Sequence, residues 1–152
     1  MKQDRLVTCD VCGLSYVTGL DTRTHNAKHA KFLALSDRYA EPRFGGDLWL
    51  YPQREEEKHA ASDIIDGEGR TIEERLAALE RIAYSWYCRA VLGCRKRAPH
   101  FDKYCALLGE TVQELFSIDI AAAFTDRYGT SPGVIPRGFT DLPETGRNRE
   151  RW

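Results

Sequence analysis

The 152-residue chain lacks several features that define large classes of proteins. No apolar run approaches the roughly eighteen residues that a membrane-spanning helix needs, and the N-terminal MKQDRLVTCDVCG has no apolar stretch of the kind found in secretion signals. Five cysteines are an odd number, which argues against a closed disulfide framework. We therefore expect a reduced, cytoplasmic protein without a membrane segment, whose cysteines are free thiols or metal ligands.

Signatures of common enzymes are also missing. The sequence contains no H-E-x-x-H, G-x-S-x-G, P-loop or G-x-G-x-x-G pattern, so nothing in it argues for catalysis. The net charge is only -1, which excludes a general polyanion binder and restricts any nucleic-acid contact to a local patch.

Apolar residues recur at spacings of three and four along much of the chain, which predicts a mainly α protein. Thr71 and Glu74 form a capping-box pattern at the start of the clearest helix, and Leu48–Tyr51 reads as a short strand or an apolar anchor. The expected helices span about 21–39, 52–65, 71–93, 99–109 and 111–128, the fourth stopped by Gly109 and the last broken near Ser117. The expected domains are a metal module with an extended helix (1–39), a helical domain (40–129) and an extended or disordered tail (130–152).

One motif stands above the rest of the sequence. Two residues separate Cys9 from Cys12, twelve separate Cys12 from His25, and three separate His25 from His29. This pattern, C-x2-C-x12-H-x3-H, is the spacing of a zinc site with two cysteine and two histidine ligands (C2H2). A tight turn presents both thiolates to one metal, and histidines at i and i+4 present two imidazoles from one helical face. We predict one structural Zn2+ with no open position for water.

The packing around this site follows the usual finger pattern except at one position. Val7 and Tyr16 stand where a finger has its small core, and Gly13 suits the turn after the second cysteine. Thr22 replaces the usual leucine before the first histidine, and we expect Leu20 to substitute for it. Since this core is small, metal binding is expected to supply on the order of 10 kcal/mol of the folding free energy.

The segment VTCDVCGLSYVTGLDTRTHNAKHAKF, residues 7–32, resembles C2H2 fingers. More closely, it resembles the finger that precedes the catalytic domain of sister-chromatid cohesion acetyltransferases. The shared features are C-x2-C-G-[aliphatic]-x-[Tyr], an acidic residue before the helix, and H-x3-H-x2-[Phe]. The resemblance implies a ligand role for Cys9, Cys12, His25 and His29 and a packing role for Tyr16 and Phe32. It does not imply acetyltransferase activity, because the glycine-rich pyrophosphate loop has no counterpart here.

The second half is weakly similar to short uncharacterised bacterial and prophage proteins, which carry a tyrosine-serine helix, P-x-F-x-x-Y and a late Y-G-x-x-P-G. This resemblance implies no activity. The matching residues are Tyr84, Ser85, Pro99, Phe101, Tyr104, Tyr128, Gly129, Pro132 and Gly133.

The helix positions that would read DNA argue against sequence-specific recognition. Positions -1, 3 and 6 of a DNA-reading finger fall on Thr18, Asp21 and Thr24, none of which makes a bidentate base contact of the arginine or asparagine kind. We expect the finger to act as a structural clip whose helix continues onto a bundle of about three to four helices.

The densest positive block, residues 81–104, has six lysine or arginine residues and one acidic residue. Basic residues beside aromatic ones suit phosphates and unstacked bases, whereas the alternative is a solvated turn that balances the acidic residues 55–57. The candidate nucleic-acid or partner contacts are Arg89, Arg95, Lys96, Arg97 and Lys103.

Three hypotheses about function stay open at this point. The sequence favours a non-catalytic zinc-finger binding protein, a regulator or adaptor that contacts nucleic acid or a nucleoprotein partner. The alternative is a phage-type protein that inhibits a host nuclease or defence complex by protein–protein binding. The third is an enzyme, or a second metal set, built from Cys88, Cys94, His100 and Cys105, although their irregular spacing favours core cysteines.

Overall fold

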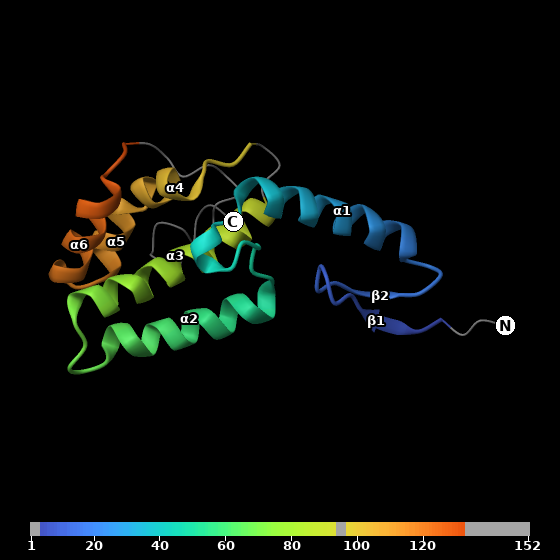
Figure 1. Ribbon diagram of the computed structural model, residues 1–152, viewed down its shortest axis with the longest axis horizontal. Helices are drawn as coiled ribbons and strands as arrows, with labels where there is room; N and C mark the ends of the chain where they lie inside the picture. The colour runs from blue at the N-terminus through green and yellow to red at the C-terminus, as the bar shows by residue number, and fades with distance from the viewer. Residues whose placement is uncertain (1–3, 94–96, 133–152) are drawn as a thin grey trace. The chain divides into compact units, whose positions relative to one another are not determined.

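The computed structural model describes residues 4–93 and 97–132, and the contacts divide the chain into two units, Met1–Leu50 and Tyr51–Trp152. The described residues form a β-hairpin and six α-helices, which confirms the mainly α fold class with an N-terminal hairpin–helix module (Figure 1). In chain order the elements are β1 (Leu6–Thr8), β2 (Ser15–Val17), α1 (Thr22–Tyr39), the 3-10 turn η1 (Pro42–Phe44), α2 (Tyr51–Asp66), α3 (Ile72–Gly93), α4 (Phe101–Leu107), α5 (Gly109–Leu115) and α6 (Ile118–Tyr128).

The hairpin of the N-terminal unit is a short antiparallel ribbon. Val7 pairs with Tyr16, and the side-chain hydroxyls of Thr8 and Ser15 lie 2.8 Å apart across the two strands. A two-stranded ribbon of three residues per strand is not stable in water without further packing. The hairpin therefore depends on the contacts that its connecting turn makes with α1.

One face of α1 is buried, and its residues recur at helical spacing as the sequence predicts. That face consists of His25, Phe32, Ser36 and Tyr39, with His29 half-buried beside them. The backbone N–H of Leu48 donates to the Ser36 hydroxyl at 3.3 Å, and both Leu48 and Trp49 are buried. The segment after η1 is thus an apolar anchor rather than a strand.

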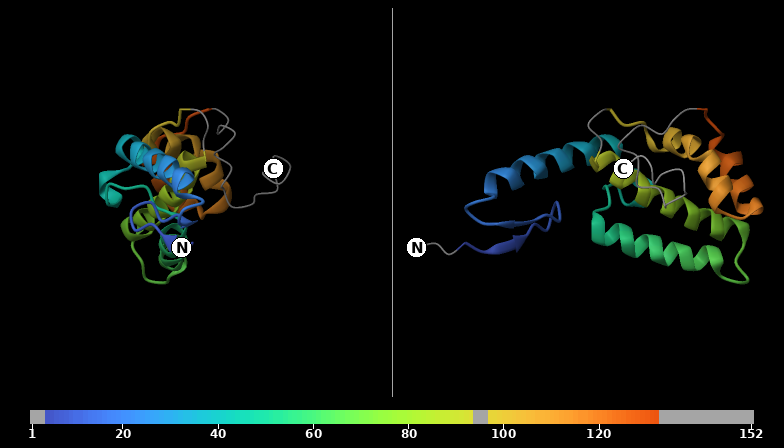
Figure 2. Two further views of the ribbon diagram at one scale, coloured as in Figure 1. Left: turned by 90° about the vertical axis from the view of Figure 1, so that its right-hand side faces the viewer. Right: turned by 180° about the vertical axis from the view of Figure 1, so that it is seen from behind.

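Helix α3 is the centre of the second unit. It runs antiparallel to α2, and the two helices lie side by side in all views (Figures 1 and 2). The apolar residues at spacings of three and four along α3 are buried, including Leu79 and Ala83 at zero exposure, except Ile72 in the first turn, which is 39% exposed. Helices α4 and α6 cover further sides of α3. A helix that is apolar around most of its circumference must be enclosed in this way.

Aromatic rings fill the space between α3 and α4. The ring of Tyr87 lies 5.4 Å from Phe101 and 5.2 Å from Tyr104, and its hydroxyl donates to the Pro99 carbonyl at 2.9 Å. Tilted and edge-to-face pairs of this kind are favoured by the ring quadrupoles. Phe101, Tyr104, Cys105 and Leu108 recur at helical spacing in the 99–109 segment, and all four are buried.

The predicted helix ends are mostly confirmed. The Glu74 N–H donates to the Thr71 hydroxyl at 3.2 Å, so Thr71 caps α3, and the break near Ser117 separates α5 from α6. Gly109 was expected to stop a helix, and this is wrong: it is the first residue of α5. It also lies close to the loop after α6, since a Cβ there would lie 3.1 Å from the side chain of Thr130.

Two charged side chains of α3, Arg75 and Glu80, form hydrogen bonds with residues of other helices in the second unit. Arg75 donates to the Ile65 carbonyl, to Ser117 and to Asp119, so one guanidinium joins the end of α2 to the start of α6. Buried Glu80 accepts from Arg127 and, at 2.8 Å, from the hydroxyl of Tyr128. A buried carboxylate requires such partners to offset its desolvation.

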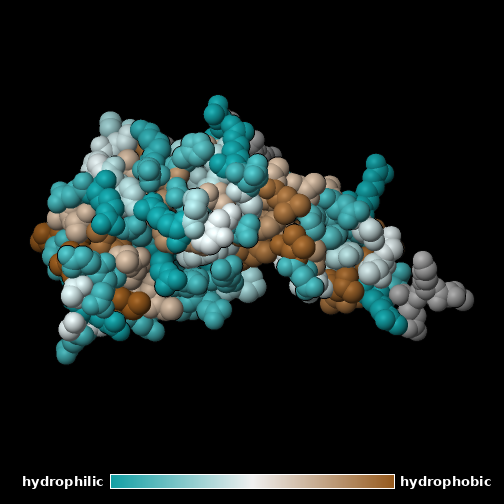
Figure 3. All heavy atoms as spheres, viewed as in Figure 1, coloured by the Kyte–Doolittle hydropathy of each residue, from teal (hydrophilic) through white to brown (hydrophobic). Residues whose placement is uncertain are grey.

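The surface shown in Figure 3 is mainly hydrophilic over the helical unit, with apolar side chains gathered over parts of the hairpin and α1. No helix within residues 4–93 and 97–132 combines the length and hydropathy that crossing a membrane requires.

We expect Asp119→Asn to weaken the second unit at neutral pH. The hydrogen bonds from Ser117 and then Arg75 hold the pKa of Asp119 well below its usual value of 3.8. A lowered carboxyl pKa contributes stability that is present above that usual value and is lost as the pH falls. The difference in free energy of unfolding between parent and variant should therefore shrink on acidification below pH 3.8.

Urea titrations monitored by helical circular dichroism from neutral pH to about pH 3 would measure this difference. Asp126→Asn, on an exposed face of the same helix, is the matched control. A pH-independent difference for Asp119→Asn would contradict the assignment.

Candidate metal centre

The turn between the two strands brings two sulfur atoms to one side of the hairpin. The Gly13 N–H donates to the Cys9 carbonyl at 2.8 Å, and the Cys9 N–H donates to the Leu14 carbonyl at 2.9 Å. Gly13 has φ +70°, in the left-handed region that a residue with a Cβ adopts at a cost. The glycine after the second cysteine thus allows the chain to reverse and present both thiols together.

The two imidazoles come from the first turns of α1. The His25 N–H donates to the Asp21 carbonyl at 2.8 Å, which opens the helix, and His29 follows one turn later. Asp21 does not cap α1 with its side chain. Its carboxylate instead lies 3.4 Å from the Val17 N–H, which ties the loop before α1 to the end of β2.

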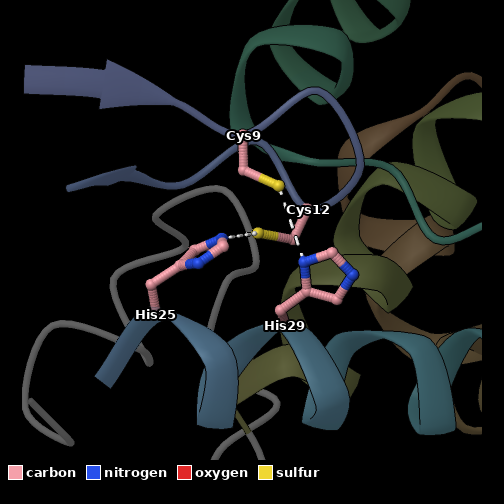
Figure 4. A group of neighbouring side chains, drawn as sticks. All are labelled: Cys9, Cys12, His25 and His29. Atoms are coloured by element: carbon pink, nitrogen blue, oxygen red, sulfur yellow. Dashed lines mark hydrogen bonds between the residues drawn. The ribbon is translucent and has the colours of Figure 1, made fainter. Parts of the chain in front are cut away.

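The four predicted ligands converge on one point. Their donor atoms all lie within 4.8 Å of one another (Figure 4). The sulfur of Cys12 is 3.3 Å from Nε2 of His25, and that of Cys9 is 3.5 Å from Nδ1 of His29. Sulfur and nitrogen ligands of one tetrahedral zinc are about 3.6 Å apart, given the usual bond lengths. The donor set and its spacing therefore fit a metal ion held by four protein ligands.

The two thiols have opposite electrostatic environments. Backbone N–H groups, first that of Cys12 and then that of Val11, lower the pKa of the Cys9 thiol from 9.0 to about 6. Burial raises the pKa of the Cys12 thiol above 9.0. Since the thiolate is the form that binds metal, Cys9 is the sulfur already favoured as an anion, and a bound cation would be needed to favour the same form of Cys12.

Tyr16 and Phe32 pack as the finger resemblance implies. The ring of Tyr16 stacks on that of His25 at 4.0 Å with an interplanar angle of 7°, and Phe32 is buried. The expectation that Leu20 fills the place of the missing leucine is wrong, because Leu20 is 81% exposed. It lies in the loop between β2 and α1, and Tyr16 covers His25 instead.

One neighbour of the site was not predicted from the sequence. A Cβ on Gly13 would lie 2.5 Å from a terminal methyl of Leu50, so the Leu50 side chain packs directly against the turn. Leu50 belongs to the same unit but follows the turn by more than thirty residues. No local pattern could identify that contact.

The other candidate residues do not gather into a second site among the described residues. Cys88 and Cys105 are fully buried in the helical unit, in agreement with the interpretation as core cysteines. Of the predicted basic contacts, Arg89, Arg97 and Lys103 are exposed, and Lys103 donates to Ser131 at 2.6 Å. Cys94, Arg95 and Lys96 lie outside the described residues.

Comparisons with protein-family models, curated proteins and solved structures return no match to the chain. The class of site is therefore defined by its own geometry: a C2H2-like group that joins a β-hairpin to the helix that follows it. The resemblance of the second half to prophage proteins stays a prediction.

Loss of the ring that covers His25 should weaken metal binding. We expect Tyr16→Ala to lower the affinity for Co2+ by about tenfold or more, in the range typical for residues that orient a metal ligand. Tyr16→Phe keeps the stacked ring and should bind nearly as well as the parent. Competition with a chromophoric chelator measures both affinities, and equal affinities for parent and Tyr16→Ala would contradict the orienting role.

Proposed function

We propose that the protein is a non-catalytic binding protein, a regulator or adaptor, whose N-terminal unit is organised by one structural Zn2+. Two thiolates and two imidazoles in a tetrahedral arrangement are the donor set that zinc prefers. The convergence of these four groups is the observation that supports the proposal most directly. Four protein ligands leave no open position for water or substrate, so the metal's role is to hold the fold.

The metal would hold the hairpin and α1 together. The hairpin is too short to be stable alone, and the buried face of α1 has only a few apolar side chains. A structural zinc site contributes on the order of 10 kcal/mol to the folding of small modules. The N-terminal unit should therefore lose its structure when the metal is removed, whereas the aromatic core of the second unit contains none of the four ligands.

Cys12→Ser tests this part of the proposal. Purified parent protein should contain one zinc per chain, and the variant should lose it together with the N-terminal hydrogen-exchange protection, because one of two sulfur ligands is gone. Native mass spectrometry measures the metal, and residue-level exchange measures the protection. Cys88→Ala, a core cysteine outside the cluster, is the control that should keep its zinc. Parent protein without zinc, or a variant that retains it, would refute the metal's role.

The exposed side of α1 supports nucleic acid as the partner. The helix has four basic residues, Arg23, Lys28, Lys31 and Arg38, and all four are exposed, whereas Asp37 is its single acidic residue. Within the part of the chain that the structure describes, Arg23, Lys28 and Lys31 form no ion pair. These cations are therefore available to an anionic partner. We call this set the basic flank of α1.

The basic flank has a regular geometry. At about 100° per residue, its four cations fall within an arc of about 140°, and Asp37 lies outside it. Three of the residues between them on the same arc are small, namely Thr24, Ala27 and Ala34, and the fourth is the half-buried Leu35. Fifteen residues of helix span about 22 Å, so the four cations are spread along most of the length of α1.

Duplex DNA is the partner that best fits this surface. A helix of about 10–12 Å diameter enters the major groove of B-DNA, whereas the major groove of A-form RNA is too narrow. Thr18, Asp21 and Thr24, the positions that would read bases in a finger, have no side chain suited to a bidentate base contact, and so we propose that the basic flank contacts phosphates. The binding that we propose is therefore independent of sequence. The exposed Arg89, Arg97 and Lys103 of the second unit are additional candidate phosphate contacts.

The salt dependence of binding tests the DNA contact. A labelled 20-base-pair duplex of mixed sequence, at about four phosphate contacts, should give a slope near -3.6 for log affinity against log salt. Lys28→Glu with Lys31→Glu should reduce the steepness of this slope by about two. Fluorescence anisotropy between about 50 and 200 mM NaCl measures both values.

The matched control is Arg70→Glu with Arg81→Glu, which changes the net charge by the same amount at two exposed positions of the second unit. This control should leave the slope nearly unchanged. A flat salt dependence for the parent, or an equal effect of both double variants, would refute the role of the basic flank. Single-stranded RNA of the same length serves as the competing ligand and should bind more weakly.

A further inference from the structure

We propose that the two histidines bind the metal through different ring nitrogens, His25 through Nε2 and His29 through Nδ1. This inference rests on the proposed zinc site. It goes further because the spacing H-x3-H is the same whichever nitrogen is used, and so the sequence leaves the choice open.

The distances select one nitrogen of each ring. Nε2 of His25 is the atom within 3.3 Å of the Cys12 sulfur, and Nδ1 of His29 is the atom within 3.5 Å of the Cys9 sulfur. Figure 4 shows these two nitrogens turned toward the sulfurs, with Nε2 of His29 turned away from the cluster. Both sulfur–nitrogen distances are close to about 3.6 Å, the separation of sulfur and nitrogen ligands that bind the same tetrahedral zinc.

Packing fixes the orientation of both rings. Tyr16 stacks flat on His25, and the His25 and His29 rings meet edge to face, with centroids 5.5 Å apart and planes at 90°. Nδ1 is two bonds from Cβ and Nε2 is three, so the two nitrogens differ in reach.

The two uncoordinated nitrogens have different surroundings. Nδ1 of His25 is buried, and it has no hydrogen-bond partner among the described residues. His29 is half-buried, so its Nε2–H is the one that water reaches more readily. A zinc-bound histidine ordinarily donates its second N–H to an acceptor, and only His29 can do so to solvent here.

Nitrogen NMR on the zinc-loaded full chain tests the assignment directly. With 15N-labelled histidine, long-range proton–nitrogen correlations distinguish Nδ1 from Nε2, and the shift of each nitrogen reports whether it carries a proton or the metal. We expect His25 to be protonated at Nδ1 and His29 at Nε2. Assignment uses the single substitutions His59→Gln and His100→Gln, which remove the two histidine signals from outside the cluster.

Carboxylate substitutions provide an independent readout. An aspartate oxygen has the reach of Nδ1, and a glutamate oxygen has the reach of Nε2. At position 29, we expect His29→Asp to retain zinc about tenfold better than His29→Glu. At position 25 the order should reverse, with His25→Glu better than His25→Asp. Each pair is its own control, because both members introduce the same charge, and chelator competition measures all four affinities.

The outcomes separate this inference from the proposed function. Zinc bound through Nε2 of both histidines, or the same order of carboxylate variants at both positions, overturns the mixed ligation and leaves the zinc module intact. Parent protein that binds no zinc overturns both. Should a variant fail to fold, the NMR measurement on the unsubstituted chain still decides the question.

Discussion

The convergence of two sulfur and two nitrogen atoms is the constraint on which the N-terminal unit depends. The hairpin pairs only three residues per strand, and α1 buries few apolar side chains, so neither element has enough packing to fix the other. The cluster lies where the turn and the helix meet, and Tyr16 closes it on one side. Metal coordination at that junction would convert two weak elements into one module.

The second unit is held together in a different way. Helix α3 is enclosed by α2, α4 and α6, and large aromatic side chains fill the space between α3 and α4. Arg75 and Glu80 connect the ends of helices through hydrogen bonds rather than through apolar contact. Conventional burial of this kind stabilises a domain without a metal, which is why the two units should respond differently to chelation.

The same helix serves two roles in the function that we propose. Its buried stripe carries the two imidazoles, and its basic flank lies on a different part of the circumference. A metal that has all four positions filled by protein cannot take part in catalysis through an open site. Zinc would therefore organise the surface, and exposed cations would make the contact with DNA phosphates.

Much of this architecture follows from local patterns in the sequence. The ligand spacing predicted Cys9, Cys12, His25 and His29, and apolar periodicity with capping residues predicted the helices and the break near Ser117. Such signals depend on neighbours within one or two turns, so they can be read without knowing the fold. The role of Leu20 was predicted wrongly for the same reason, because a pattern of spacing does not say which side chain reaches the histidine.

Only the tertiary structure determined the contacts between residues that are far apart in the sequence. The contact between Gly13 and Leu50, the close approach of Gly109 to Thr130 and the ring nitrogen of each histidine that faces a sulfur all depend on positions in space. The sequence by itself determined which groups could hold a metal ion and where the helices run, since covalent spacing and helical repeat are local properties. The orientation of these side chains was determined only by the folded chain. Burial and interatomic distances depend on packing against residues that are distant in the sequence.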